Sequence, residues 1–124
     1  MPIPILKQGT VLIASLQAAA TDADLMQLKD ELAAKVGQYR SKGVVIDVTV
    51  LDVMDSFATR TLRGIAQTTR LRGAEMVLVG LQPDVAFAMV QLGLTLDGIV
   101  TALDLEEGLG LLTARTSEGA GRGM

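Results

Sequence analysis

Residues 43–60 of the chain read GVVIDVTVLDVMDSFATR and contain one predicted strand and the start of a predicted helix. The β-branched apolar run Val44–Thr49, bounded by Gly43, is typical of a buried strand. Ser56 has the hydroxyl that a helix N-cap favours, because its oxygen accepts a hydrogen bond from an unpaired backbone N–H. The sequence therefore predicts a buried strand that leads to a serine at the start of a helix.

Ser56 has two interpretations. A helix N-terminus stabilises an anion by roughly 0.3–1 kcal/mol at an exposed site, through its unpaired N–H groups and its dipole. A hydroxyl at this position is therefore well placed to carry a phosphate. The residues alone favour the alternative, a plain helix cap, so a function has to be argued from the rest of the chain.

Strand and helix patterns alternate on both sides of this segment. Further strands are predicted at 3–6, 10–16, 75–80 and 99–103. Helices are predicted at about 22–40, where Thr21 and Asp24 form a capping-box pattern, then from Ser56 to about 72, at 83–92 and at 105–113. This order predicts an α/β fold with a mixed, mostly parallel β-sheet, an N-terminal hairpin and about four helices. We assign the domain to residues 1–115 and predict a disordered C-terminal tail at 116–124.

The composition limits the class of protein. A chain of 124 residues can bury one core, and that core must be aliphatic because the chain has two Phe, one Tyr and no Trp. The net charge of −3 and the few aromatic residues argue against nucleic-acid binding. The chain has no signal-peptide pattern and no apolar run near the roughly 20 residues of a membrane span. We therefore expect a cytoplasmic protein with neither nucleic acid nor membrane as a partner.

Most catalytic residue types are missing. The chain has no cysteine and no histidine, which excludes thiol nucleophiles, zinc–thiolate sites and the commonest general base. No Gly-rich phosphate-binding motif follows a strand, so we predict no enzyme and no cofactor, and a phosphate on Ser56 would come from another protein. Asp47, Asp52 and Asp55 suit Mg²⁺ or a receiver domain, but a receiver needs an acidic pair and a lysine on other strands. We interpret these carboxylates as a solvated acidic loop and expect no metal.

A basic stripe is predicted on the helix after Ser56. Arg60, Arg63, Gln67 and Arg70 follow helical spacing and lie opposite the apolar face of that helix. The stripe is either a solvated face or a docking surface for an acidic partner, bound through Arg–carboxylate pairs.

The helix at 83–92 is predicted to have two apolar sides. Phe87, Val90 and Leu94 project away from the side that faces the core. Such an outer stripe needs cover, either from the last helix or the tail, or from another molecule. We favour another molecule and predict an assembly surface at these three residues.

Several segments together resemble a known family. The strand-to-helix element, VVIDVT at 44–49 and VMDS at 53–56, resembles the STAS domain of anti-sigma factor antagonists. Later segments are similar to the stressosome antagonist of the RsbS type within that family: GLQPDVA at 80–86, QLGL at 91–94 and TALDLEEGL at 101–109. The resemblance covers residues 3 to about 112. Phe57 and Ala58 after Ser56 differ from the Asp-Ser-Ser-Gly of the simpler sporulation-type antagonists.

The resemblance implies a bacterial, non-enzymatic scaffold and antagonist in stress signalling. It implies assembly with STAS sensor paralogues of the RsbR type into a large complex, the stressosome, so we expect a homo-oligomer or a large hetero-assembly. It also implies a switch serine kinase of the RsbT type, released on phosphorylation, and a resetting phosphatase. Ser56 occupies the phosphoacceptor position of the family's Asp-Ser motif. We predict a kinase or partner surface around it, formed by Asp52, Asp55, Phe57, Arg60 and Arg63.

Two other functions stay open at this point. The same fold could serve a conventional anti-anti-sigma factor, which competes for an anti-sigma kinase as a small soluble species. It could also serve a ligand-binding STAS module, which needs a concave apolar pocket with convergent polar groups. Thr59 and Thr61 rank below Ser56 as modification sites, because a phosphate inside a helix meets fewer free N–H groups.

Overall fold

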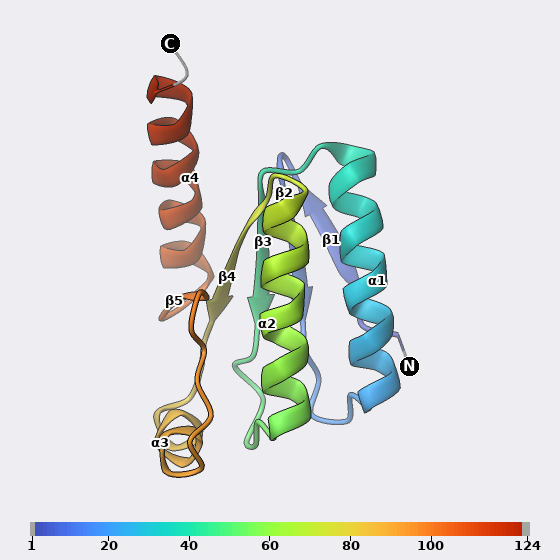
Figure 1. The fold of residues 1–124 in the computed structure, drawn as a ribbon, viewed down its shortest axis with the longest axis vertical. Coiled ribbons are helices and arrows are strands. Elements are labelled where there is room, and N and C mark those ends of the chain that lie inside the picture. Colours follow the sequence, from blue (N-terminus) through green and yellow to red (C-terminus); the bar gives the residue numbers. More distant parts are fainter. Residues whose placement is uncertain (1, 123–124) are drawn as a thin grey trace.

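A five-stranded sheet forms the centre of the molecule, and its strands lie side by side in chain order (Figure 1). The computed structural model describes the backbone of residues 2–122 and the side chains of residues 2–114. The first two strands pair antiparallel as a hairpin, and every later pair is parallel. The predicted mixed, mostly parallel sheet with an N-terminal hairpin is therefore confirmed. The strands are β1 (Ile5–Gln8), β2 (Val11–Ser15), β3 (Gly43–Asp47), β4 (Glu75–Val79) and β5 (Val100–Ala102).

In the described backbone, residues 2–122, four helices complete the fold (Figure 1). Helices α1 (Asp22–Tyr39) and α2 (Ser56–Leu71) lie next to each other and cover one face of the sheet. The other face is covered by α4 (Leu105–Arg122). Helix α3 (Pro83–Gln91) lies beyond the end of the sheet at which β4 ends (Figure 1). The carboxyl ends of the parallel strands, the N-terminus of α2 and α3 therefore occupy the same end of the molecule.

The central strands are buried on both faces, which explains their continuous apolar runs. Val44 and Ile46 of β3 point into the main core beneath α1 and α2, where Leu62 of α2 is also fully buried. Val45 points to the opposite face, where it joins a smaller cluster with Leu112 of α4. Because successive side chains of a strand alternate between faces, one short run of residues contributes to both clusters.

The first strand and the last helix differ most from their predicted boundaries. The hairpin begins at Ile5 rather than Ile3, because Pro4 has no N–H to donate to a strand ladder. Helix α4 continues to Arg122 instead of ending near Thr113. Glycines weaken a helix by about 1 kcal/mol each but do not end it as proline does. The predicted disordered tail, 116–124, overlaps the helical backbone of α4 as far as Arg122, and its side chains lie outside the part of the chain that the structure describes. The predicted domain boundary at residue 115 stays a prediction.

The N-terminus of α1 confirms the predicted capping box. The backbone N–H of Asp24 donates to the Thr21 hydroxyl at 3.1 Å, and the Thr21 N–H donates to the Asp24 carboxylate at 3.0 Å. The hydrogen bond from the Thr21 backbone has the largest effect on the pKa of Asp24, and it holds this pKa below its ordinary value of 3.8. The ionised form of Asp24 is therefore the form that stabilises the cap.

Replacing Asp24 should reduce the sensitivity of the protein to acid. Because the pKa of Asp24 is lower in the folded state than in the unfolded state, its contribution to stability is present above pH 3.8 and is lost as the pH falls through the lowered value. The urea midpoint of wild type is expected to fall more steeply below about pH 5 than that of Asp24→Asn. Asp30→Asn, in an exposed position of the same helix, is the control and should keep the wild-type slope. Equal slopes for wild type and Asp24→Asn would contradict this prediction.

Candidate functional site

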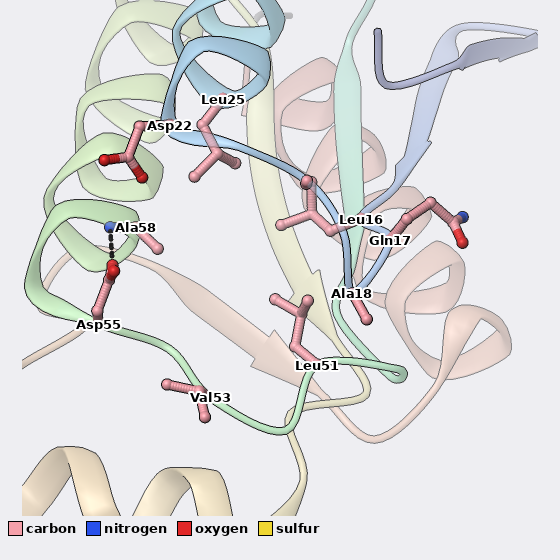
Figure 2. A pocket seen from close by; sticks show the side chains of 10 residues that line it. Leu16, Gln17, Ala18, Asp22, Leu25, Leu51, Val53, Asp55 and Ala58 are labelled. Carbon is pink, nitrogen blue, oxygen red and sulfur yellow. Dashed lines mark hydrogen bonds between the residues drawn. The ribbon is translucent and has the colours of Figure 1, made fainter. Parts of the chain in front are cut away.

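The N-terminus of α2 is capped by Asp55 and not by Ser56, which corrects one prediction. Asp55 has extended backbone angles, and its carboxylate accepts a hydrogen bond from the Ala58 N–H at 2.8 Å (Figure 2). Aspartate is as favourable at an N-cap as serine, so two adjacent candidates compete for the same place. Ser56 becomes the first helical residue, and its exposed hydroxyl is not used as a cap.

Ser56 is also the accessible hydroxyl among the first residues of α2. Thr59 is fully buried and donates to the Asp55 carbonyl at 2.8 Å. Thr61 is 7% exposed and donates to the Phe57 carbonyl at 2.8 Å. A modifying enzyme would have to unwind the helix to reach either threonine, whereas Ser56 needs no such change.

The loop between β3 and α2 is fixed by contacts with the loop between β4 and α3. The Asp47 carboxylate accepts hydrogen bonds from the N–H of Thr49 at 2.9 Å and from its hydroxyl. The Thr49 carbonyl accepts a bond from the Gln82 side chain at 2.7 Å. Gly80 has a φ of +79°, and a Cβ added there would collide with the Thr49 side chain. These contacts join the loop that leads to Ser56 to the loop between β4 and α3.

The three carboxylates of the acidic loop have separate roles. Asp47 holds Thr49, Asp55 caps α2, and Asp52 is exposed. Within residues 2–114 no group of three or more Asp, Glu, His or Cys side chains is arranged to hold a metal ion. The loop is therefore a negatively charged surface beside Ser56.

A hollow of about 180 Å³ lies between the β2–α1 and β3–α2 loops, next to the start of α2 (Figure 2). Its wall is mainly apolar, and the carboxylates of Asp22 and Asp55 lie along it (Figure 2). No local motif predicts this hollow, because its two sides come from distant parts of the sequence. The lining residues are Leu16, Gln17, Ala18, Ala20, Asp22, Leu25, Leu51, Val53, Asp55 and Ala58.

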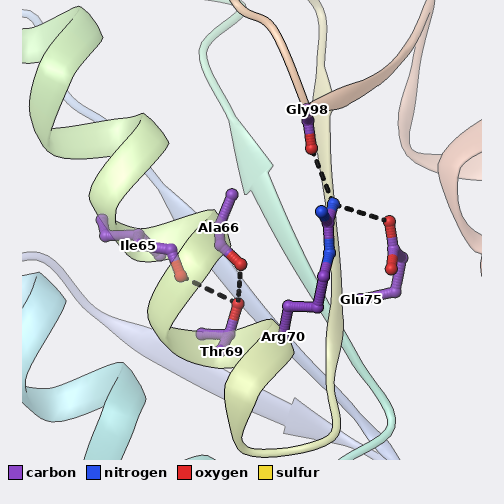
Figure 3. A network of polar contacts seen from close by, with 6 residues as sticks. All are labelled: Ile65, Ala66, Thr69, Arg70, Glu75 and Gly98. Atoms are coloured by element: carbon purple, nitrogen blue, oxygen red, sulfur yellow. Dashed lines mark hydrogen bonds and ion pairs between the residues drawn. The ribbon is translucent and has the colours of Figure 1, made fainter.

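Two of the three arginines in the predicted basic stripe hold the chain between α3 and β5 against α2. Arg63 donates to Thr95, to the carbonyl at 3.5 Å and to the hydroxyl at 3.3 Å. Arg70 donates to the Gly98 carbonyl at 2.7 Å and forms an ion pair with Glu75 at 3.4 Å (Figure 3). Arg60, the third arginine of the stripe, is exposed one turn after Ser56. The docking role of the stripe stays a prediction.

Two of the three residues of the predicted assembly surface are exposed. Phe87 and Val90 of α3 are 65% and 74% exposed. Leu94, in contrast, is partly buried against the main core. The chain leaves the helix after Gln91 and turns at Gly93, whose φ is +71°, so helical spacing no longer predicts the direction of Leu94. Leu92, which directly follows α3 in the sequence, is 72% exposed.

Within the part of the chain that the structure describes, no helix combines the length and the apolar character needed to cross a bilayer.

Comparisons with known proteins agree on the fold. A family model described as the STAS domain matches residues 3–107. A solved structure of a serine-to-glutamate variant of RsbS from Moorella thermoacetica is 36% identical, with a TM-score of 0.80, over 93% of this chain and 97% of that one. A chain from a solved stressosome structure is 37% identical, with a TM-score of 0.77, over 91% of this chain and 98% of that one.

A curated relative extends the comparison. The RsbT co-antagonist protein RsbRA of Bacillus subtilis is 30% identical over 83 residues, which is 67% of this chain. The chain spans 30% of the length of that relative.

Proposed function

The chain belongs to the STAS domain family, and we propose that it is a stressosome scaffold and antagonist, which holds a switch serine kinase and releases it when Ser56 is phosphorylated. The full-length similarity to RsbS and to a chain of the stressosome supports this proposal. The observation that carries it is the position of Ser56, exposed at the first residue of α2 with Asp55 as the cap. In this role the chain is a non-enzymatic substrate of the kinase.

The proposed kinase surface surrounds Ser56. Asp52, Asp55 and Arg60 are exposed around the serine, and Phe57 is half-buried. The hollow beside α2 offers an apolar recess for a side chain of the kinase. Arg63 contributes less than the sequence predicted, because its guanidinium is already bound to Thr95.

Phosphorylation would change this surface without moving the backbone. A phosphate adds about −1.5 to −2 charges at neutral pH, and the carboxylates of Asp52 and Asp55 already lie in the loop before it. A kinase that covers Ser56 and fills the hollow would have to enclose this anion, so the phosphate removes the kinase by repulsion and by blocking contacts. The loop is held by Asp47 and Gln82, so a local change of charge is enough.

The other proposed partners bind elsewhere on the chain. STAS sensor paralogues of the RsbR type need a surface that stays available while the kinase is bound. Phe87 and Val90 of α3 form an exposed apolar pair outside the Ser56 loop, and burying them in an assembly is favourable. We assign the assembly contact to these two residues and to Leu92. A phosphatase that resets Ser56 completes the cycle.

The kinase switch can be tested by affinity purification from the source cells. Tagged wild type and Ser56→Ala should recover a small serine kinase together with STAS paralogues. Ser56→Asp should recover the paralogues but at least about tenfold less kinase, which corresponds to about 1.4 kcal/mol of binding free energy. Thr10→Asp is the matched control, because it adds the same charge at an exposed turn beside the opposite ends of the parallel strands, and should behave as wild type.

Mass spectrometry of the recovered protein completes the test. Phosphate on Ser56 after stress is expected in wild type. Recovery of a kinase in a small complex without paralogues would instead identify a conventional anti-anti-sigma factor. An unmodified Ser56 and no kinase would contradict the proposal and favour a ligand-binding STAS module, with the hollow beside α2 as its site.

A further inference from the structure

Ser56 and Arg60 are neighbours on the surface of α2. Both side chains are exposed, and they are four residues apart in one helix. Side chains with this spacing lie on the same face, about 5–6 Å apart at their Cβ atoms. Helical side chains also lean toward the N-terminus, so Arg60 leans toward Ser56. An anion that precedes a cation by four residues is the favourable order for such a pair.

Arg60 is available for a new ion pair, unlike the other arginines along its stripe. Arg63 is bound to Thr95. Arg70 is bound to the Gly98 carbonyl and to Glu75. Within residues 2–114 Arg60 makes neither a hydrogen bond nor an ion pair with another side chain. Its guanidinium can therefore turn toward an anion without breaking an existing contact.

The backbone at the start of α2 offers only part of what a phosphate needs. The N–H of Ala58 already donates to the Asp55 carboxylate, and the N–H of Thr59 already donates to the Asp55 carbonyl. Negative charge already surrounds this end of α2, from Asp22 at the start of α1, Asp52 in the loop before α2 and the cap Asp55, and it opposes an added anion. A positive side chain would therefore stabilise a phosphate on Ser56 further, and Arg60 is one turn away.

We propose that the Arg60 guanidinium binds the phosphate of phosphorylated Ser56; this inference rests on the proposed function. The planar guanidinium can donate two parallel hydrogen bonds to phosphate oxygens. Phosphorylation then has two effects on the kinase surface: it adds an anion and it withdraws Arg60 from the partner. Arg60 thus increases the difference in kinase binding between the unphosphorylated and the phosphorylated form of Ser56.

The second pKa of the phosphate measures this pairing directly. Phosphoserine is incorporated at position 56 by genetic encoding, and its ³¹P shift is followed by NMR between pH 4 and 8. A neighbouring guanidinium stabilises the dianion, so the phosphate pKa should rise by about half a unit in Arg60→Gln relative to wild type. Arg60→Lys keeps the charge and should retain most of the effect.

Arg63→Gln is the matched control. It removes the same charge from the same helix, seven residues from Ser56, and should leave the phosphate pKa within about 0.1 unit of wild type, because exposed charges at that distance are largely screened. Equal phosphate pKa values in wild type and Arg60→Gln would overturn the inference. The encoded phosphate is present whether or not a kinase acts on Ser56, so this result is independent of the test of the proposed function.

Discussion

Leu62→Ala is expected to lower the free energy of unfolding by about 3–4 kcal/mol. Leu62 is fully buried in the main core, on the side of α2 that faces the sheet. Truncation removes three carbon atoms from an apolar environment and leaves a cavity that the surrounding rigid elements cannot fill. Urea unfolding followed by circular dichroism measures the loss.

Leu71→Ala separates the effect of burial from that of residue type. Leu71 is the last residue of the same helix and is 89% exposed. The same substitution there should change the free energy of unfolding by no more than about 0.5 kcal/mol. Similar losses for the two variants would show that α2 does not pack on the sheet through Leu62.

Gly80→Ala is expected to destabilise the protein by about 2–4 kcal/mol, for two separate reasons. The φ of +79° is unfavourable for any residue with a Cβ. The new Cβ would also collide with the side chain of Thr49, which belongs to the loop that leads to Ser56. We therefore expect a lower unfolding midpoint together with changed amide NMR shifts around Ser56.

Two further variants distinguish these reasons. Gly93 also has a positive φ, of +71°, but has open space around it, so Gly93→Ala should cost only the backbone term of about 1–2 kcal/mol. Thr49→Ala removes the hydroxyl that collides with the new Cβ, so Gly80→Ala should cost about 1 kcal/mol less in that background. Additive losses in the double variant would contradict a direct clash between positions 80 and 49.

Most of the fold was predictable because local and global signals agree. The β-branched run of β3 is buried on both faces, and Thr21 and Asp24 form the predicted capping box. The prediction of a STAS domain is confirmed by the family match over residues 3–107. The end of α4 was missed because glycines in a helix lower its stability without preventing it.

The site was less predictable, because it depends on choices between similar residues and on contacts between distant ones. Asp55 and Ser56 are equally good caps, and sequence alone does not decide which one the backbone uses. Arg63 has the spacing of a solvated face. In the folded chain it contacts Thr95, a residue between α3 and β5, and helical spacing does not predict such a distant contact. Leu94 was misplaced because helical spacing was extended past Gly93.

The order of the strands in the sheet has a consequence for biosynthesis. Each strand pairs with the one that precedes it in the chain, from β1 through to β5. A growing polypeptide can therefore add each strand to a sheet edge that has already left the ribosome, without waiting for a later segment to insert between two strands. Once residue 79 has emerged, β1 to β4 and both helices on one face are present. The Ser56 helix can thus pack on the sheet before α3 has been synthesised, so the apolar surface of α3 emerges only after β1 to β4 and the helices on one face are present.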